Sequence, residues 1–195
     1  MNVPPIILAS ASPRRVEQLR QVSFRFKVIP SDATECEHEQ FTAWEIAQLN
    51  AYRKARAVAK KFPDSLVIGA DTVVCLGTRL YAKPRDAKDA CRMLGELQGH
   101  THDVVTGVCL LHLRAHRQRV FADSTAVTFR KLNSSKIRDY VAKVNTLDKA
   151  GAYAIQDDGE SIIEGIFGSY TNVVGLPVER LREELRAWAA AAAGS

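Results

Sequence analysis

The segment Leu66–Leu76 constrains the fold more than any other part of the sequence, because a long apolar run is interrupted there by one acidic side chain, Asp71. A run so rich in β-branched and aliphatic residues predicts a strand buried on both faces of a sheet. An unpaired carboxylate is costly to bury, so Asp71 must be paired, protonated or close to a metal. Its small neighbours Gly69 and Ala70 leave room for a ligand, and no helix pattern follows that the aspartate could cap.

Strand and helix patterns alternate around this run and predict an α/β layer architecture built on a mixed sheet. Residues 3–9 predict a second buried strand, residues 24–29 alternate like a third, and residues 41–62 predict a long helix with its inward stripe at positions 44, 47, 51, 55, 58 and 62. The other patterns predict helices over 86–97 and 134–144, strands over 102–113 and 119–129, and a last helix opened by Pro177. We expect the alanine-rich tail, 187–195, to fray.

Composition narrows the class of protein. A length of 195 residues with 46% hydrophobic and 25% charged residues indicates one folded domain, residues 1–195, with two lobes as a variant. No apolar run is long enough for a membrane span, and the first eight residues lack the basic leader of a signal peptide. Four cysteines without a CxxC spacing are typical of free thiols in a reducing compartment, so we expect a cytoplasmic protein.

Charge and the familiar motifs exclude several functions. The net charge of +5 tolerates an anionic partner, but the basic residues form no run interleaved with aromatics, so nucleic-acid binding is a minority interpretation. The sequence has neither a GxxxxGK[ST] loop nor a GxGxxG turn that opens a helix after a strand. His100 and His102 alternate without a third ligand nearby, which favours ordinary histidines over a zinc site.

The stretch Ser10-Ala11-Ser12-Pro13-Arg14-Arg15 is the first candidate for binding chemistry. Ser12 is a good N-cap and Pro13 suits the first helical position, so a helix is expected to begin there, at the end of a buried strand. Free N–H groups in a first turn attract anions, yet the helix dipole disfavours the two arginines in that turn. A polyanion bound beside this turn would make the positive charge of the two arginines favourable. The alternative is a capped helix whose arginines lie in solvent.

Two lysines and one further segment are weaker candidates. Lys54 falls among the inward positions of the long helix, where it either reaches a buried partner or extends to the surface. Lys83, before Pro84, is by itself an ordinary loop lysine. Residues 148–156 combine charged with small residues, which suits close backbone packing or a ligand, and composition does not decide between them.

Taken together, these stretches resemble the Maf-type (septum-formation-like) family of nucleoside triphosphate pyrophosphatases, from about Ile6 to Leu185. The resemblance rests on the order and spacing of seven motifs: Leu8-Ala9-Ser10-Ala11-Ser12-Pro13-Arg14-Arg15, Gly69-Ala70-Asp71-Thr72, Lys83-Pro84, Gly99-His100-Thr101-His102 leading to Thr106-Gly107-Val108, Asp148-Lys149-Ala150-Gly151-Ala152-Tyr153, Ile155-Gln156 and Val174-Gly175-Leu176-Pro177.

The resemblance implies an elongated mixed sheet flanked by helices, with two lobes and a central cleft, similar to inosine triphosphate pyrophosphatases. It implies cleavage of a nucleoside triphosphate to the monophosphate and pyrophosphate, with Mg²⁺ or Mn²⁺. The family's catalytic carboxylate falls on Asp71, which would act as base and, with Glu35, as metal ligand. The phosphate-binding positions fall on Ser10, Ser12, Arg14, Arg15, Lys54 and Lys83.

Substrate choice in the family depends on positions that fall on Arg14, Thr72 and Gln156, and the residues found here are those of the branch acting on dTTP and UTP. Ala154, where the family usually has glycine, and Asp157-Asp158 depart from its pattern and bear on substrate preference more than on reaction type. The alternative function is a nucleotide-binding regulator of cell division with little turnover. A two-lobed enzyme of this kind is often a homodimer, so a homodimer is kept as one option for its oligomeric state.

Overall fold

The computed structural model describes residues 4–22, 24–36 and 40–193. In this part of the chain, seven strands form one mixed sheet in the order β2-β1-β3-β5-β6-β7, with β4 paired to β3 outside that path. The strands are β1 (Ile6–Leu8), β2 (Phe26–Val28), β3 (Leu66–Leu76), β4 (Arg79–Tyr81), β5 (Thr101–His112), β6 (Arg117–Phe129) and β7 (Ile163–Phe167). β1 is parallel to β2 and β3, and the remaining pairs are antiparallel. The predicted mixed α/β sheet is therefore confirmed.

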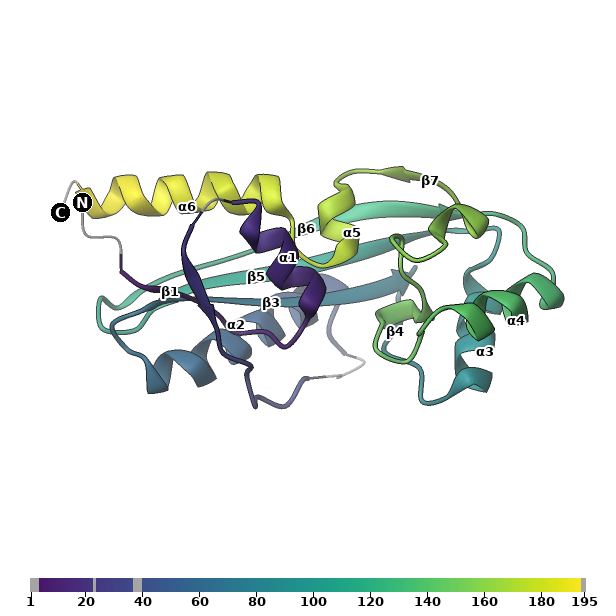
Figure 1. The fold of residues 1–195 in the computed structure, drawn as a ribbon, viewed down its shortest axis with the longest axis horizontal. Coiled ribbons are helices and arrows are strands. Elements are labelled where there is room, and N and C mark those ends of the chain that lie inside the picture. The colour runs from purple at the N-terminus through teal and green to yellow at the C-terminus, as the bar shows by residue number, and fades with distance from the viewer. Residues whose placement is uncertain (1–3, 23, 37–39, 194–195) are drawn as a thin grey trace.

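Three long strands, β3, β5 and β6, run through most of the length of the molecule (Figure 1). Because side chains alternate between the two faces of a strand, neighbouring residues of β3 belong to different layers. Leu66, Ile68 and Ala70 pack against the apolar sides of α1 (Pro13–Arg20) and α6 (Val178–Ala193). Val67 packs against α2 (Ala43–Lys61) on the opposite face. By this alternation Asp71 faces α2, and Thr72 faces α1.

Helix α2 lies unusually close to the sheet. A Cβ atom built on Gly69 would lie 2.2 Å from the carbonyl oxygen of Ala51, and one built on Gly107 would lie 2.3 Å from the carbonyl carbon and oxygen of Ala47. Glycines facing alanines therefore set this approach. The inward stripe predicted for the helix is correct at positions 47, 51, 55 and 58 but wrong for Trp44 and Phe62, which are 46% and 40% exposed. Phe62 is the C-cap and has a non-helical backbone, so helical spacing no longer places it on the inward face.

A second group of elements surrounds the far ends of the long strands (Figure 1). It contains α3 (Ala87–Leu97), α4 (Ser134–Lys143) and the single turns η1 (Ala150–Ala152) and η2 (Gly159–Ser161). Its core is a separate cluster that includes Leu94, Phe129 and Tyr140. The molecule thus has one sheet with an apolar core near each end, which is the arrangement expected of two lobes.

The chain closes with α5 (Tyr170–Val174) and α6, which lies along the sheet face that also carries α1. Helix α6 extends through Ala193, so the structure keeps helical most of the segment expected to fray; residues 194–195 lie outside the described residues. The high helix propensity of alanine accounts for the continuation. Over the described ranges, every helix is too short or too polar to cross a bilayer. All four cysteines are free thiols.

His102 is a core residue. Its ring is 2% exposed, stands edge-on to Phe129 at 4.7 Å between ring centroids, and places Nε2 2.8 Å from the Tyr153 hydroxyl. Nδ1 has no partner among the described residues. Burial without a counter-charge lowers the pKa of His102 to about 4.

This buried histidine predicts a loss of stability in mild acid. Between pH 6.5 and about 4 the unfolded chain binds a proton that the folded chain does not, so the free energy of unfolding falls as the pH falls. The expected loss is about 3 kcal/mol once the pH reaches the folded-state pKa. Urea unfolding at pH 7 and pH 4.5 measures it. The free energy of unfolding should depend less steeply on pH in His102→Gln. His100 is exposed, so the control His100→Gln should keep the pH dependence of the wild type. Equal slopes for wild type and His102→Gln would contradict this account.

Candidate active site

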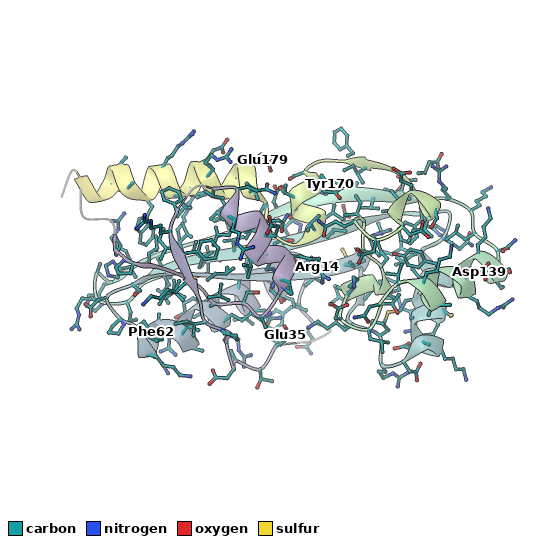
Figure 2. All side chains as sticks on the ribbon, in the orientation of Figure 1. Arg14, Glu35, Phe62, Asp139, Tyr170 and Glu179 are labelled. Atoms are coloured by element: carbon teal, nitrogen blue, oxygen red, sulfur yellow. The ribbon has the colours of Figure 1, made fainter. Side chains whose placement is uncertain are left out.

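One cleft of about 1230 Å³ opens between the two groups of elements. Ten residues predicted from the sequence to belong to the site line this cleft: Ser10, Ser12, Arg14, Arg15, Glu35, Lys54, Asp71, Thr72, Lys83 and Gln156. They come from α1 and the turn before it, the segment after β2, α2, β3, the loop after β4, and the segment after η1. Figure 2 shows Arg14 and Glu35 in the central part of the molecule. All ten predicted residues therefore lie in the same cleft.

The centre of the cleft is an ion cluster around Asp71, which is 7% exposed. The Nζ atom of Lys54 donates to Asp71 Oδ1 at 2.6 Å and to Glu35 Oε1, also at 2.6 Å. Lys54 therefore does not extend to the surface; it pairs with the acid that the strand buries. This contact meets the requirement that a carboxylate on a buried strand has a partner.

Asn50 completes the surroundings of Asp71, and the sequence analysis missed it. Because residues four apart share a helix face, Asn50 and Lys54 both point from α2 toward the strand. Asn50 Nδ2 donates to Asp71 Oδ2 at 3.0 Å. The same amide accepts from the backbone N–H of Cys36 at 2.7 Å and donates to its carbonyl at 3.1 Å, so it also anchors the segment that carries Glu35. A buried polar residue one helical turn before Lys54 was the signal that could have identified it.

Glu35 is held in its charged form. Burial raises the pKa of this carboxyl, but the hydrogen bond and charge of Lys54 outweigh burial, and Lys83 and Arg15 add to them, so the pKa lies below its usual value. The Nζ atom of Lys83 lies 3.6 Å from Glu35 Oε2. The loop lysine thus faces the cluster from the other side of the cleft.

The turn before α1 has the predicted geometry. Ser12 caps the helix by accepting from the backbone N–H of Arg15 at 3.5 Å, and Pro13 occupies the first helical position. The Ser10 hydroxyl accepts from the Ser12 N–H at 3.1 Å. The first helical turn contains no acidic residue. Its N–H groups and two arginines therefore present positive charge to the cleft, as an anion site requires.

The two arginines, Arg14 and Arg15, differ in their hydrogen-bond partners and in their depth in the protein. Arg14 Nη1 donates to Asp148 Oδ2 at 3.3 Å, and this pair joins α1 to the segment after α4. Arg15 is more deeply placed and donates to the Gly175 carbonyl at 2.7 Å and to the Thr72 hydroxyl at 2.9 Å. Burial lowers the pKa of Arg15, and the charges of Asp71 and Glu35 oppose that shift. Arginine remains charged even so, because a guanidinium does not lose its proton in proteins.

Gln156 enters the cleft from a short turn after η1, and its side chain is exposed. The buried Tyr140 hydroxyl accepts from the Ala154 N–H at 3.1 Å and lies 3.3 Å from the carbonyl oxygens of both Ala154 and Asp157. One hydroxyl from α4 thus fixes the backbone on both sides of Gln156. Tyr140 gave no signal in the sequence beyond an ordinary inward aromatic residue.

The carboxylates fit a divalent cation that arrives with a phosphate ligand. Over the described ranges, no three His, Cys, Asp or Glu side chains converge as metal ligands. Asp71 and Glu35, however, meet at the ammonium group of Lys54, so two carboxylates face one point. Mg²⁺ is commonly held by one or two carboxylates, with phosphate oxygens and water as its remaining ligands. The donor set therefore fits Mg²⁺ or Mn²⁺.

The fold places the chain in a known class of α/β proteins. It is similar to the structure of a HAM1 protein from Coxiella burnetii, with a TM-score of 0.56 over 95% of this chain and 100% of that one. At 15% sequence identity this likeness concerns the fold alone.

The family follows from the sequence comparison. The model of the family described as Maf-like protein matches residues 5–188, and the chain belongs to that family. Among its relatives, a dTTP/UTP pyrophosphatase of Pelotomaculum thermopropionicum is 43% identical over 93% of this chain and 95% of the relative. One of Gloeobacter violaceus, with the same name, is 46% identical over 90% and 92%. The predicted family membership is confirmed.

Proposed function

We propose that this protein hydrolyses dTTP and UTP to the nucleoside monophosphate and pyrophosphate. The observation that carries the proposal is the pairing of Asp71 with Lys54 in a cleft that Arg15 and the first turn of α1 also line. Relatives that cover nearly the whole chain bear the name dTTP/UTP pyrophosphatase, which supports the choice of substrate.

In this proposal the basic residues hold the triphosphate. Arg14 and Arg15 grip the β and γ phosphates, because a planar guanidinium offers paired N–H groups to phosphate oxygens. The Ser10–Ser12 turn adds its N–H groups. Lys54 and Lys83 neutralise the charge that develops on the bridging and non-bridging oxygens.

Asp71 acts as the general base. Its carboxylate accepts a proton from the water that attacks the α phosphorus; the bond from that phosphorus to the oxygen bridging to the β phosphate breaks, and pyrophosphate leaves with the electron pair. Asp71 and Glu35 are the residues that would hold Mg²⁺ or Mn²⁺, which when bound neutralises phosphate charge. Gln156, Thr72 and Arg14 occupy the positions on which substrate choice depends in the family, and the amide of Gln156 matches the donor and acceptor edge of a pyrimidine base. A homodimer and a cytoplasmic location remain predictions.

A substrate panel tests the proposal. We expect pyrophosphate and monophosphate from dTTP and UTP with Mg²⁺ or Mn²⁺, slower turnover of dCTP, dATP and 7-methyl-GTP, and none after chelation of the metal. Release of inorganic phosphate in place of pyrophosphate would overturn the α–β cleavage. Stoichiometric binding of UTP without product would favour the nucleotide-binding regulator, and salt-sensitive retention of DNA would favour a nucleic-acid partner.

A further inference from the structure

A buried chain of hydroxyl groups runs from Arg15 away from the cleft. Arg15 Nη2 donates to Thr72 Oγ1 at 2.9 Å, Thr72 Oγ1 lies 3.0 Å from Thr106 Oγ1, and Thr106 Oγ1 lies 3.0 Å from the carbonyl oxygen of Asn172. Thr106 and Asn172 are both 0% exposed. The chain therefore links a residue of the cleft to the interior through two threonines.

The direction of every bond in this chain is determined by its two ends. A guanidinium can only donate, a carbonyl can only accept, and each threonine hydroxyl has one proton. Thr106 must give its proton to the Asn172 carbonyl, so Thr106 accepts from Thr72. The single proton of Thr72 is used in that bond while its oxygen accepts from Arg15. Thr72 therefore has no proton to donate to a carbonyl oxygen of a pyrimidine base.

The same contacts fix the orientation of Arg15. Its Nε donates to the Gly175 carbonyl at 2.7 Å, and one Nη2 hydrogen is taken by Thr72. Of the five N–H groups of a guanidinium, these two have partners among the described residues, which leaves three for a ligand in the cleft. The two hydrogen bonds together restrict the guanidinium to one orientation.

We propose that Thr106 is a positioning residue for Arg15, and that Thr72 contributes to substrate binding by placing this guanidinium on the phosphates rather than by donating a hydrogen bond to the base. The inference rests on the proposed function for its substrate. Thr106 is not among the residues that line the cleft, so its hydroxyl reaches the cleft through its two partners, Thr72 and Asn172, and only the path through Thr72 leads directly to Arg15.

Binding of inorganic pyrophosphate, which has no base, is the sharpest test. Calorimetric titration of the full chain with pyrophosphate and Mg²⁺ is expected to show affinity reduced about tenfold or more in Thr72→Val and in Thr106→Val, since a hydrogen bond to a charged group is lost or disordered. Thr106→Ser keeps the hydroxyl and should stay within about threefold of wild type. Unchanged affinity in Thr72→Val would overturn the proposal, whether or not the protein has enzymatic activity.

Kinetics and a matched control separate positioning from loosened structure. With dTTP, Thr106→Val should raise KM by about the same factor as it weakens pyrophosphate binding, with a smaller effect on kcat and an unchanged ratio of dTTP to dCTP turnover. Thr125 is also 0% exposed and contacts Asn172, but it does not contact Arg15. Thr125→Val should lower the melting temperature comparably and leave KM within about twofold. Equal KM increases in the two variants, or a change in base preference in Thr106→Val, would contradict the inference. If Thr106→Val does not fold, Thr72→Val decides, because Thr72 is only half-buried.

Discussion

Replacing Asp71 with Asn is expected to lower kcat for dTTP by about 10²–10⁴-fold while dTTP binding stays largely intact, because an amide cannot take the proton of the attacking water. The structure adds a second reason. Asp71 accepts from Lys54 on one oxygen and from Asn50 on the other, so an amide in either orientation turns its NH₂ group toward a donor. Asn50 does not flip to compensate, since both ends of its amide are engaged by the backbone of Cys36.

Pyrophosphate release measures the loss, and calorimetry with dTTP measures binding in the same variant. Asp32→Asn is the control: Asp32 is an exposed acid paired with Lys61 outside the cleft, and its replacement should leave both measurements unchanged. Near-normal pyrophosphate release by Asp71→Asn would remove the residue from the role of base.

Gly107→Ala is expected to destabilise the fold by about 3 kcal/mol or more, at the upper end of what overpacking costs. The added methyl group would meet the backbone of α2, with the Ala47 carbonyl atoms at 2.3 Å and the Gln48 nitrogen at 2.6 Å. Backbone cannot rotate away as a flexible side chain can, so the helix must shift. For a chain of this length the melting temperature should fall by about 6–12 °C. Because α2 carries Asn50 and Lys54, activity measured well below the transition should also fall.

Gly95→Ala provides the opposite control. Gly95 lies inside α3, and a Cβ built there meets nothing within 4 Å. Alanine is the better helix former, so this variant should be stabilised by about 0.5–1 kcal/mol. If thermal melts show that Gly107→Ala is as stable as wild type, then Gly107 is not required for the close approach of α2 to the sheet.

The cap at Ser12 and the strand boundaries of β3 could be read from the sequence because their causes are local. A serine followed by proline starts a helix through contacts within four residues, and an apolar β-branched run forms a strand wherever it is buried. The position of Asp71 within that run also indicated a special environment, since a charged acid on a buried strand requires a partner. The resemblance to the family then identified the ten cleft residues without showing which of them are in contact.

The inward stripe of α2 shows why the rest could not be predicted. Periodicity alone placed Trp44 and Phe62 on the buried face, whereas the structure exposes both side chains, and Phe62 lies past the last helical residue. The roles of Asn50 and Tyr140 depend on backbone groups of other segments; the spacing of Asn50 from Lys54 hinted at its position but not at its partners, and Tyr140 gave no such hint.

By itself, the sequence determined the mixed α/β class, the capped first turn with its two arginines, and the need for a partner, a proton or a metal at Asp71, because each follows from local geometry or from the cost of burying charge. Only the tertiary structure decided that Lys54 is that partner, that Asn50 holds the other carboxylate oxygen, and that Thr72 donates its proton to Thr106. Hydrogen bonds between distant elements have direction and distance, and neither quantity exists until the chain has folded.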